Sequence, residues 1–163
     1  MTINVGDPIP SIELSTMTPE GPKTFSSDEF LKGKKIAMFG LPGAFTPTCS
    51  AKHLPGFVEH SDAIKAKGID NIICISVNDC FVMGAWGKDQ NVGDKVMMVA
   101  DGSAKFAKAT GLLKDLTERG MGIRCQRFSM IVDDGIVKSV HIDESALERT
   151  SAEEMLSELD ELI

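Results

Sequence analysis

The chain has 163 residues, of which 42% are hydrophobic and 25% are charged, and its formal net charge is −7. This length supports one domain with a substantial core, and the composition excludes a disordered or fibrous protein. The charge is uneven, because residues 143–163 carry eight acidic side chains and one basic one, which leaves the rest of the chain neutral. A neutral body offers no basic stripe for nucleic acid, and no apolar run is long enough to span a bilayer.

The first residues show neither the basic nor the apolar segment of a secretory signal. We therefore expect a cytoplasmic protein, or an organellar one if a transit peptide has been removed. In such a reducing compartment the four cysteines are expected to be free thiols. No pair of them has CxxC spacing, and the three histidines complete no recognisable ligand set, so the sequence predicts neither a metal nor a cofactor.

Hydrophobic patterning predicts an alternation of strands and helices along the chain. The expected elements are a strand at 35–40, a helix from about 49 to 67 that Pro55 should kink, a strand at 71–77 buried on both faces, a helix at 80–89, a short strand at 96–100 and a helix at 103–110. The Asp134-Gly135 pair then predicts a hairpin between strands 127–133 and 136–142.

The acidic tail is expected to form a last helix. Ser151 is its predicted cap, and Met155, Leu159 and Leu162 form its predicted apolar stripe. Its acidic side chains are interpreted as a solvated face. The order of elements predicts an α/β, thioredoxin-like fold in which helices flank a central mixed sheet, with residues 1–163 as a single domain.

The segment most informative about chemistry is the loop at 40–50, GLPGAFTPTCS, between the first predicted strand and the long helix. Cys49 is predicted to lie where that helix begins, and there unpaired N–H groups and the helix dipole favour an anion. A thiolate at such a position is reactive, whereas most free cysteines are buried and inert. The position favours the reactive interpretation of Cys49.

Residues 42–57, PGAFTPTCSAKHLPGF, resemble the peroxidatic-cysteine signature of the peroxiredoxins, in particular the type II (peroxiredoxin-5-like) subfamily. The resemblance continues at 76–79 and 127–130 and covers nearly the whole chain. It implies a thiol peroxidase with Cys49 as nucleophile and with Pro42, Thr46 and Arg127 as its partners. It also implies a homodimer that buries a face near the active-site loops.

These residue types suit the implied reaction. The Cys49 thiolate would attack a peroxide oxygen and become a sulfenic acid. Arg127, a permanent cation, would stabilise the thiolate and the developing oxyanion; Thr46 would orient the peroxide, and Pro42 would exclude water. An ordinary thiol is about 3% ionised at pH 7, so full ionisation gains only about thirtyfold and transition-state stabilisation must contribute more. His53 is interpreted as a structural histidine, with a place at the rim as the alternative, and it stays outside the catalytic set.

The thiol that reduces the sulfenic acid could belong to the same chain or to an external reductant. Residues 147–152 contain no cysteine, although some type II members carry one in this region. Cys74 is predicted to lie mid-strand, about 13 Å from the active-site edge and beyond the reach of a disulfide, so we expect it to be a core residue. Cys80 and Cys125 stay open as resolving thiols. The preferred reductant is external: glutathione, glutaredoxin or thioredoxin.

Two other functions fit parts of the sequence. A redox-sensing or chaperone-like protein would oxidise Cys49 with little turnover. A dithiol oxidoreductase is disfavoured because Thr46 occupies the position of its second cysteine.

Overall fold

The computed structural model describes residues 2–144 and 146–162. Seven strands form one sheet in the order β2-β1-β5-β4-β3-β8-β9, and β6 and β7 form a separate pair. The strands are β1 (Glu13–Thr18), β2 (Gly21–Ser26), β3 (Lys35–Gly40), β4 (Asn71–Ser76), β5 (Met97–Ala100), β6 (Leu113–Leu116), β7 (Gly122–Cys125), β8 (Arg127–Asp133) and β9 (Ile136–Asp143). The helical segments are α1 (Ser27–Leu31), η1 (Cys49–His53), α2 (Leu54–Glu59), α3 (Ser61–Ala66), α4 (Cys80–Asp89), α5 (Lys105–Thr110), η2 (Thr117–Arg119) and α6 (Ala152–Leu162).

The sheet is mixed, which confirms the predicted thioredoxin-like α/β fold. Strand β4 is parallel to both β3 and β5, whereas β8 is antiparallel to β3. Gly40, at the end of β3, lies opposite Ile75 near the end of β4 and opposite Phe128 near the start of β8. The loop after β3 and the first residues of β8 therefore meet at one edge of the sheet.

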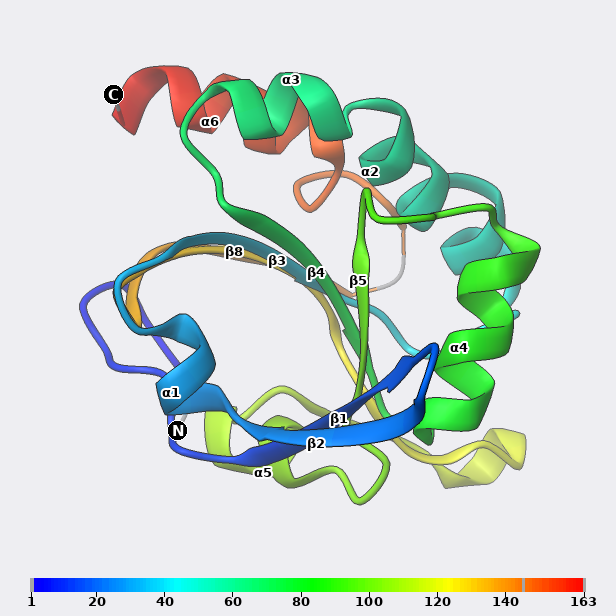
Figure 1. Ribbon diagram of the computed structural model, residues 1–163. Helices are drawn as coiled ribbons and strands as arrows, with labels where there is room; N and C mark the ends of the chain where they lie inside the picture. The colour runs from blue at the N-terminus through cyan, green and yellow to red at the C-terminus, as the bar shows by residue number, and fades with distance from the viewer. Residues whose placement is uncertain (1, 145, 163) are drawn as a thin grey trace.

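Side chains alternate between the two faces of the sheet, and each face has its own core. On β3, Ala37 and Phe39 belong to the first core, while Ile36 and Met38 belong to the second. Figure 1 shows α2, α3 and α6 over the first face and α1 and α5 on the opposite side. The two buried layers explain why β3 and β4 are almost continuously apolar in sequence.

Several predicted bounds agree with the structure. The strands at 35–40 and 127–133 and the helix at 80–89 have the bounds that the sequence predicts, and the others differ by one or two residues. The hairpin β1–β2, the short α1 and the pair β6–β7 were not predicted. Strand β2 is mostly exposed and polar, so it lacks the apolar signal that identifies a strand.

The helix predicted over 49–67 is divided at His60, between α2 and α3. In η1 the N–H of Leu54 donates to the carbonyl of Cys49, five residues earlier, which is π-helical spacing. Pro55 follows directly after this π-helical turn, inside a helical run that is continuous from 47 to 59. The kink at Pro55 stays a prediction.

The tail helix α6 confirms its predicted cap, because the N–H of Glu154 donates to Oγ of Ser151 at 3.2 Å. Met155 and Leu159 are buried, but Leu162 is 52% exposed, so including it in the apolar stripe was wrong. The acidic face of α6, which the sequence predicts to be solvated, also pairs with other parts of the protein. Three of its carboxylates pair with basic side chains of other elements: Glu153–His60, Glu158–His141 and Asp160–Lys67.

Candidate active site

The loop at 41–46 is attached to the neighbouring strand β4 by Asn78. Oδ1 of Asn78 accepts the N–H of Ala44 at 3.0 Å and the hydroxyl of Ser76 at 2.7 Å. Because β3 and β4 are parallel, Asn78 follows β4 at the same edge at which the loop leaves β3. One amide side chain therefore fixes the loop to the sheet.

Arg124 on β7 is a second anchor of the loop. Its Nε donates to the Met121 carbonyl at 2.9 Å, and its Nη1 donates to the Pro42 carbonyl at 3.4 Å. A Cβ atom on Gly43 would lie 2.7 Å from that Nη1, so a larger residue at position 43 would displace the guanidinium. The Arg124 guanidinium thus contacts the loop backbone and makes no hydrogen bond to Cys49.

Cys49 lies in the first turn of a continuous helical run, 47–59, and its side chain is only 1% exposed. Arg127, the first residue of β8, is 4% exposed, and its Nη2 donates to Cys49 Sγ at 3.3 Å. Strand alternation explains this contact, because Phe128 and Met130 belong to the second core and Ile131 to the first. Arg127 therefore extends on the same side of the sheet as Cys49.

His53 binds the other side of the guanidinium. Nη1 of Arg127 lies 2.8 Å from Nδ1 of His53, and the Thr150 carbonyl lies 3.0 Å from Nε2. Burial, together with the Arg127 charge, lowers the pKa of His53 to about 3, so the ring is neutral near pH 7. The ring is fully buried and both its nitrogens have partners, which agrees with a structural histidine and contradicts the alternative place at the rim.

A pocket of about 650 Å³ lies beside this group of residues. Its lining includes Pro42, Thr46, Leu116, Met121 and Arg127, but not the buried Cys49. Within the described residues, Nε of Arg127 is buried and has no hydrogen-bond acceptor. A buried donor without an acceptor is unusual in proteins, so this N–H is available to a bound oxygen atom. The three guanidinium nitrogens therefore differ in their partners: Nη1 contacts His53, Nη2 contacts the sulfur of Cys49, and Nε has no partner in the part of the chain that the structure describes.

The hydroxyl proton of Thr46 is already engaged in a hydrogen bond. Its Oγ1 donates to the Gly43 carbonyl at 2.6 Å, which leaves the oxygen lone pairs as acceptors. Thr46 therefore offers an acceptor in the pocket where Arg127 offers a donor. Together they form a complementary pair for a small molecule that has both an O–H group and an oxygen acceptor, as a hydroperoxide does.

All four cysteines are free and buried. Cys74 is wholly buried, which confirms it as a core residue, and burial, with smaller contributions from the Cys49 and Cys125 charges, raises its pKa well above the usual range. Cys125 belongs to the second core, across the sheet from Cys49. Cys80 is the first residue of α4 and shares the first core with Cys49.

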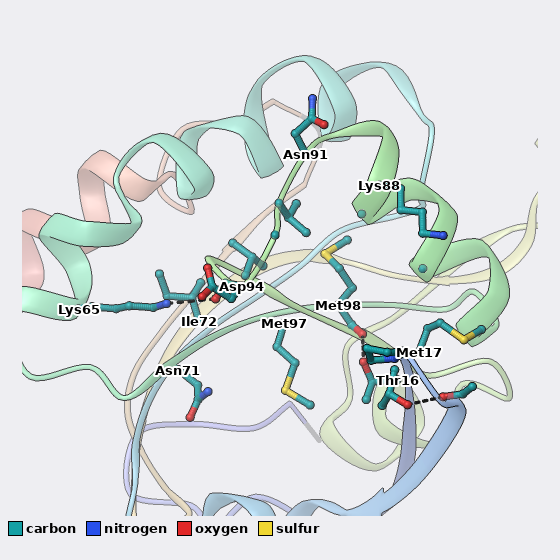
Figure 2. Close-up of a pocket in the computed structure, with 18 residues that line it drawn as sticks. Thr16, Met17, Lys65, Asn71, Ile72, Lys88, Asn91, Asp94, Met97 and Met98 are labelled. Carbon is teal, nitrogen blue, oxygen red and sulfur yellow. Dashed lines mark hydrogen bonds between the residues drawn. The ribbon is translucent and has the colours of Figure 1, made fainter.

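A larger pocket of about 1070 Å³ lies elsewhere, between the β1–β2 hairpin, α4 and the start of β4 (Figure 2). Asn71 and Ile72 line it, and both lie at the amino end of β4, whereas Cys49 follows the carboxyl end of the parallel β3. This pocket therefore opens toward the opposite edge of the sheet. No cysteine or histidine is among its lining residues.

The structure thus brings together Cys49 and Arg127, and it places Pro42 and Thr46 on the pocket that Arg127 lines. Sequence reasoning did not identify Asn78 and Thr150 and kept His53 outside the site. The spacing of His53, four residues after Cys49 on one helical face, was a usable signal. The Thr150 carbonyl gives no signal in sequence, because a backbone group 97 residues from its partner has no pattern of its own.

Comparisons with known proteins agree with this geometry. The model of the Redoxin family matches residues 4–156. Peroxiredoxin-2E, chloroplastic, of Arabidopsis thaliana is 45% identical over 163 residues, which cover 97% of this chain and 70% of that relative. Reduced Prx3 of Vibrio vulnificus, solved in complex with H2O2, superposes with a TM-score of 0.93 at 44% identity and covers 97% of this chain and 99% of its own.

Peroxiredoxin 5 of Alvinella pompejana is also similar in structure. It superposes with a TM-score of 0.86 at 32% identity, over 98% of this chain and 99% of its own.

In the part of the chain that the structure describes, no helix has the length and apolar character needed to cross a membrane.

Proposed function

Because the chain belongs to the Redoxin family, as a type II-like peroxiredoxin and hence a thiol peroxidase, we propose that Cys49 is its peroxidatic residue and that Arg127, Thr46 and Pro42 complete the site. The observation that carries this assignment is the 3.3 Å hydrogen bond to Cys49 Sγ from Nη2 of Arg127, a residue that lines the pocket. A permanent cation in contact with this sulfur suits a cysteine that reacts as an anion.

The reaction is a two-electron transfer. The Cys49 thiolate attacks the nearer peroxide oxygen, an S–O bond forms, and the O–O bond breaks. Both electrons of the O–O bond go to the leaving oxygen, which takes a proton and departs as water or an alcohol. The sulfur is thereby oxidised to sulfenic acid and the peroxide is reduced.

Each neighbouring residue has a role in this step. Nη2 of Arg127 holds the thiolate, and the free Nε donates to the peroxide oxygen on which charge develops. Thr46, having donated to Gly43, accepts the peroxide O–H and orients it. Pro42 covers the site and excludes bulk water.

We further infer that the sulfenic acid is reduced by an external thiol: glutathione, glutaredoxin or thioredoxin. The wholly buried Cys74 and the location of Cys125 on the other side of the sheet support this assignment. The tail carries Ser151 and no thiol in the region where some type II members have a cysteine. Since Cys49 is itself buried, η1 must open locally before a bulky reductant reaches the sulfur.

A homodimer and a reducing compartment complete the proposal. Phe45 and Phe81 are 54% and 64% exposed, and they flank the active-site edge on the loop at 41–46 and on α4. Large exposed aromatic side chains are typical of protein interfaces, so we assign them to the dimer face. Four free thiols suit the cytoplasm or an organelle interior. Residues 1–163 act as one domain in this scheme.

Steady-state peroxide consumption with each of the three reductants tests the scheme. We expect repeated turnover with at least one of them and no turnover by Cys49→Ser. Stoichiometric oxidation without turnover would favour a redox sensor. Non-reducing mass spectrometry of wild type, Cys80→Ser and Cys125→Ser after peroxide tests the reductant, because an intramolecular disulfide lost in either variant would contradict external reduction.

The oligomeric state tests the dimer face separately. We expect sedimentation of the wild type as a dimer and of Phe81→Asp as a monomer. A wild type that sediments as a monomer at micromolar concentration would contradict the assignment.

A further inference from the structure

Asp143, the last residue of β9, is buried and is surrounded by hydrogen-bond donors from the loop that follows it. Its carboxylate accepts the N–H groups of Glu148 at 2.9 Å, Arg149 at 3.0 Å and Thr150 at 3.0 Å, and the Thr150 hydroxyl at 2.8 Å. Burial alone would raise the pKa of Asp143, but these hydrogen bonds outweigh burial and lower it. The side chain is thus a carboxylate that organises residues 148–150.

This organisation fixes the Thr150 carbonyl. Residues 148–150 form neither helix nor strand, so no regular backbone ladder determines their position. Thr150 is nevertheless fully buried, and both its N–H and its hydroxyl donate to Asp143. Its carbonyl is left to face Nε2 of His53 at 3.0 Å.

The two neighbours of His53 specify the same tautomer. A carbonyl only accepts hydrogen bonds, so Nε2 must carry the proton. A guanidinium only donates, so Nδ1 of His53 must be unprotonated to accept from Arg127. In the opposite tautomer both contacts would be lost, because two donors would meet at one end of the ring and two acceptors at the other.

The orientation of His53 is transmitted to the thiol by the shape of the guanidinium. Nη1 and Nη2 of Arg127 belong to one rigid plane. Holding Nη1 against His53 therefore determines where Nη2 meets Cys49 Sγ and where the free Nε points. A loosened ring would let this plane rotate away from the reacting atoms.

We propose that Asp143 is a positioning residue for the peroxidase reaction: through the Thr150 carbonyl it fixes the tautomer and orientation of His53, and His53 fixes Arg127 against Cys49. The proposal rests on the proposed roles of Cys49 and Arg127. It adds a residue that does not line the pocket and touches no reacting atom.

The first test is the rate of peroxide reduction per thiolate, with the thiolate measured by its ultraviolet absorbance. For Asp143→Asn we expect a loss of about tenfold or more, since small misplacements of catalytic groups have effects of this order. The matched control is Asp160→Asn, the same substitution at a carboxylate of α6 that pairs with Lys67 and has no hydrogen bond to His53 or to residues 148–150 in the part of the chain that the structure describes. It should retain the wild-type rate within about twofold, whereas an equal loss in both variants would overturn the proposal.

The second test is a double-mutant cycle with His53→Gln. If Asp143 acts through His53, Asp143→Asn should cost less than about twofold in the His53→Gln background, because the connection is already broken. The same loss in both backgrounds would mean that Asp143 acts independently of His53, and would contradict the proposal. Cys49→Ser stays inactive in either case, so failure of this cycle is distinguishable from failure of the proposed function.

The third test begins with the wild-type protein, so its first result does not depend on the folding of a variant. Nitrogen chemical shifts of His53 in the wild-type protein report which ring nitrogen carries the proton. We expect the Nε2–H tautomer alone in the wild type, and a mixture or exchange broadening in Asp143→Asn, with restoration in Asp143→Glu. A wild-type ring protonated on Nδ1 would overturn the proposal directly.

Discussion

Nη2 of Arg127 lies 3.3 Å from Sγ of Cys49, although the two residues are 78 positions apart in sequence. The contact exists because β8 runs antiparallel to β3, so that the first residue of β8 arrives at the edge where the chain leaves β3 toward η1. Both side chains are almost completely buried. The cation therefore acts on the sulfur in a medium of low dielectric constant, where its effect is largest.

Replacing the arginine should affect the rate more than the ionisation. We expect Arg127→Ala to slow peroxide reduction by about a hundredfold or more, because the variant loses the donors to both the thiolate and the developing oxyanion. Rapid-mixing kinetics and thiolate absorbance on the same samples check this. Lys67→Ala, which removes a cation paired with Asp160 away from the site, is the control. Equal losses in thiolate fraction and rate would contradict the argument.

The Thr46 hydroxyl is predicted to act as an acceptor toward the peroxide. Thr46→Val keeps the shape but removes the oxygen, and we expect a rate loss of about ten- to a hundredfold, typical of one lost active-site hydrogen bond. Thr46→Ser keeps the hydroxyl and the bond to the Gly43 carbonyl, so it should retain most of the activity. A valine variant as fast as the serine variant would exclude this role.

The buried histidine predicts a dependence of stability on pH. The pKa of His53 is about 3 in the folded protein, against 6.5 for the ordinary side chain. Below pH 6.5 the unfolded chain therefore binds a proton that the folded protein does not, so stability falls as pH decreases from 6.5 toward 3, by at most about 1.4 kcal/mol per pH unit from this group.

Denaturant unfolding of wild type and His53→Asn between pH 6.5 and 5 measures this contribution. The variant lacks the titrating ring, so its unfolding free energy should change less steeply with pH. The difference in slope should be up to about 1.4 kcal/mol per pH unit, which corresponds to one proton. His60 and His141 are present in both proteins and cancel in the comparison. Parallel slopes would show that His53 is not buried in the neutral form.

Gly40 makes room for the ring of Phe128 at the sheet edge that carries the site. A Cβ at Gly40 would lie 2.0 Å from a ring carbon of Phe128, so Gly40→Ala should destabilise the fold by about 1–3 kcal/mol through overpacking. The control is Gly56→Ala on α2, where the nearest atom is 3.8 Å away and alanine favours the helix by about 1 kcal/mol. Thermal unfolding should shift in opposite directions in the two variants.

The sequence predicted the parts of this molecule that have local or motif-level signals. Strands β3 and β8 are apolar runs, and the Asp134-Gly135 turn marks the end of β8 and the start of its hairpin partner β9, so the bounds of β3 and β8 could be read directly. Cys49 could be singled out from its loop and Arg127 from the family resemblance. The resemblance supplied the pairing of these two residues, and residue-level reasoning alone would have left Arg127 unassigned.

The remaining parts depend on contacts between distant backbone groups. The His53 environment needs the Thr150 carbonyl, whose position depends on a carboxylate at the end of β9. The π-helical turn from Cys49 arises from one hydrogen bond with a spacing of five residues, which hydrophobic periodicity does not register. Strand β2 is polar on its exposed side and forms only because it pairs with β1.

The most direct test of the central claim is a single-turnover measurement of sulfenic acid formation. Trp86, the sole tryptophan, donates its indole N–H to Oγ of Ser50 at 3.0 Å, so its fluorescence reports on the residue beside Cys49. Reduced protein is mixed with one equivalent of peroxide, fluorescence is followed, and the sulfenic acid is trapped with a dione reagent and located by mass spectrometry. We predict a second-order fluorescence change with the label on Cys49 alone, and neither in Cys49→Ser. Peroxide consumption by Cys49→Ser at the wild-type rate, or the label on another cysteine, would contradict the account.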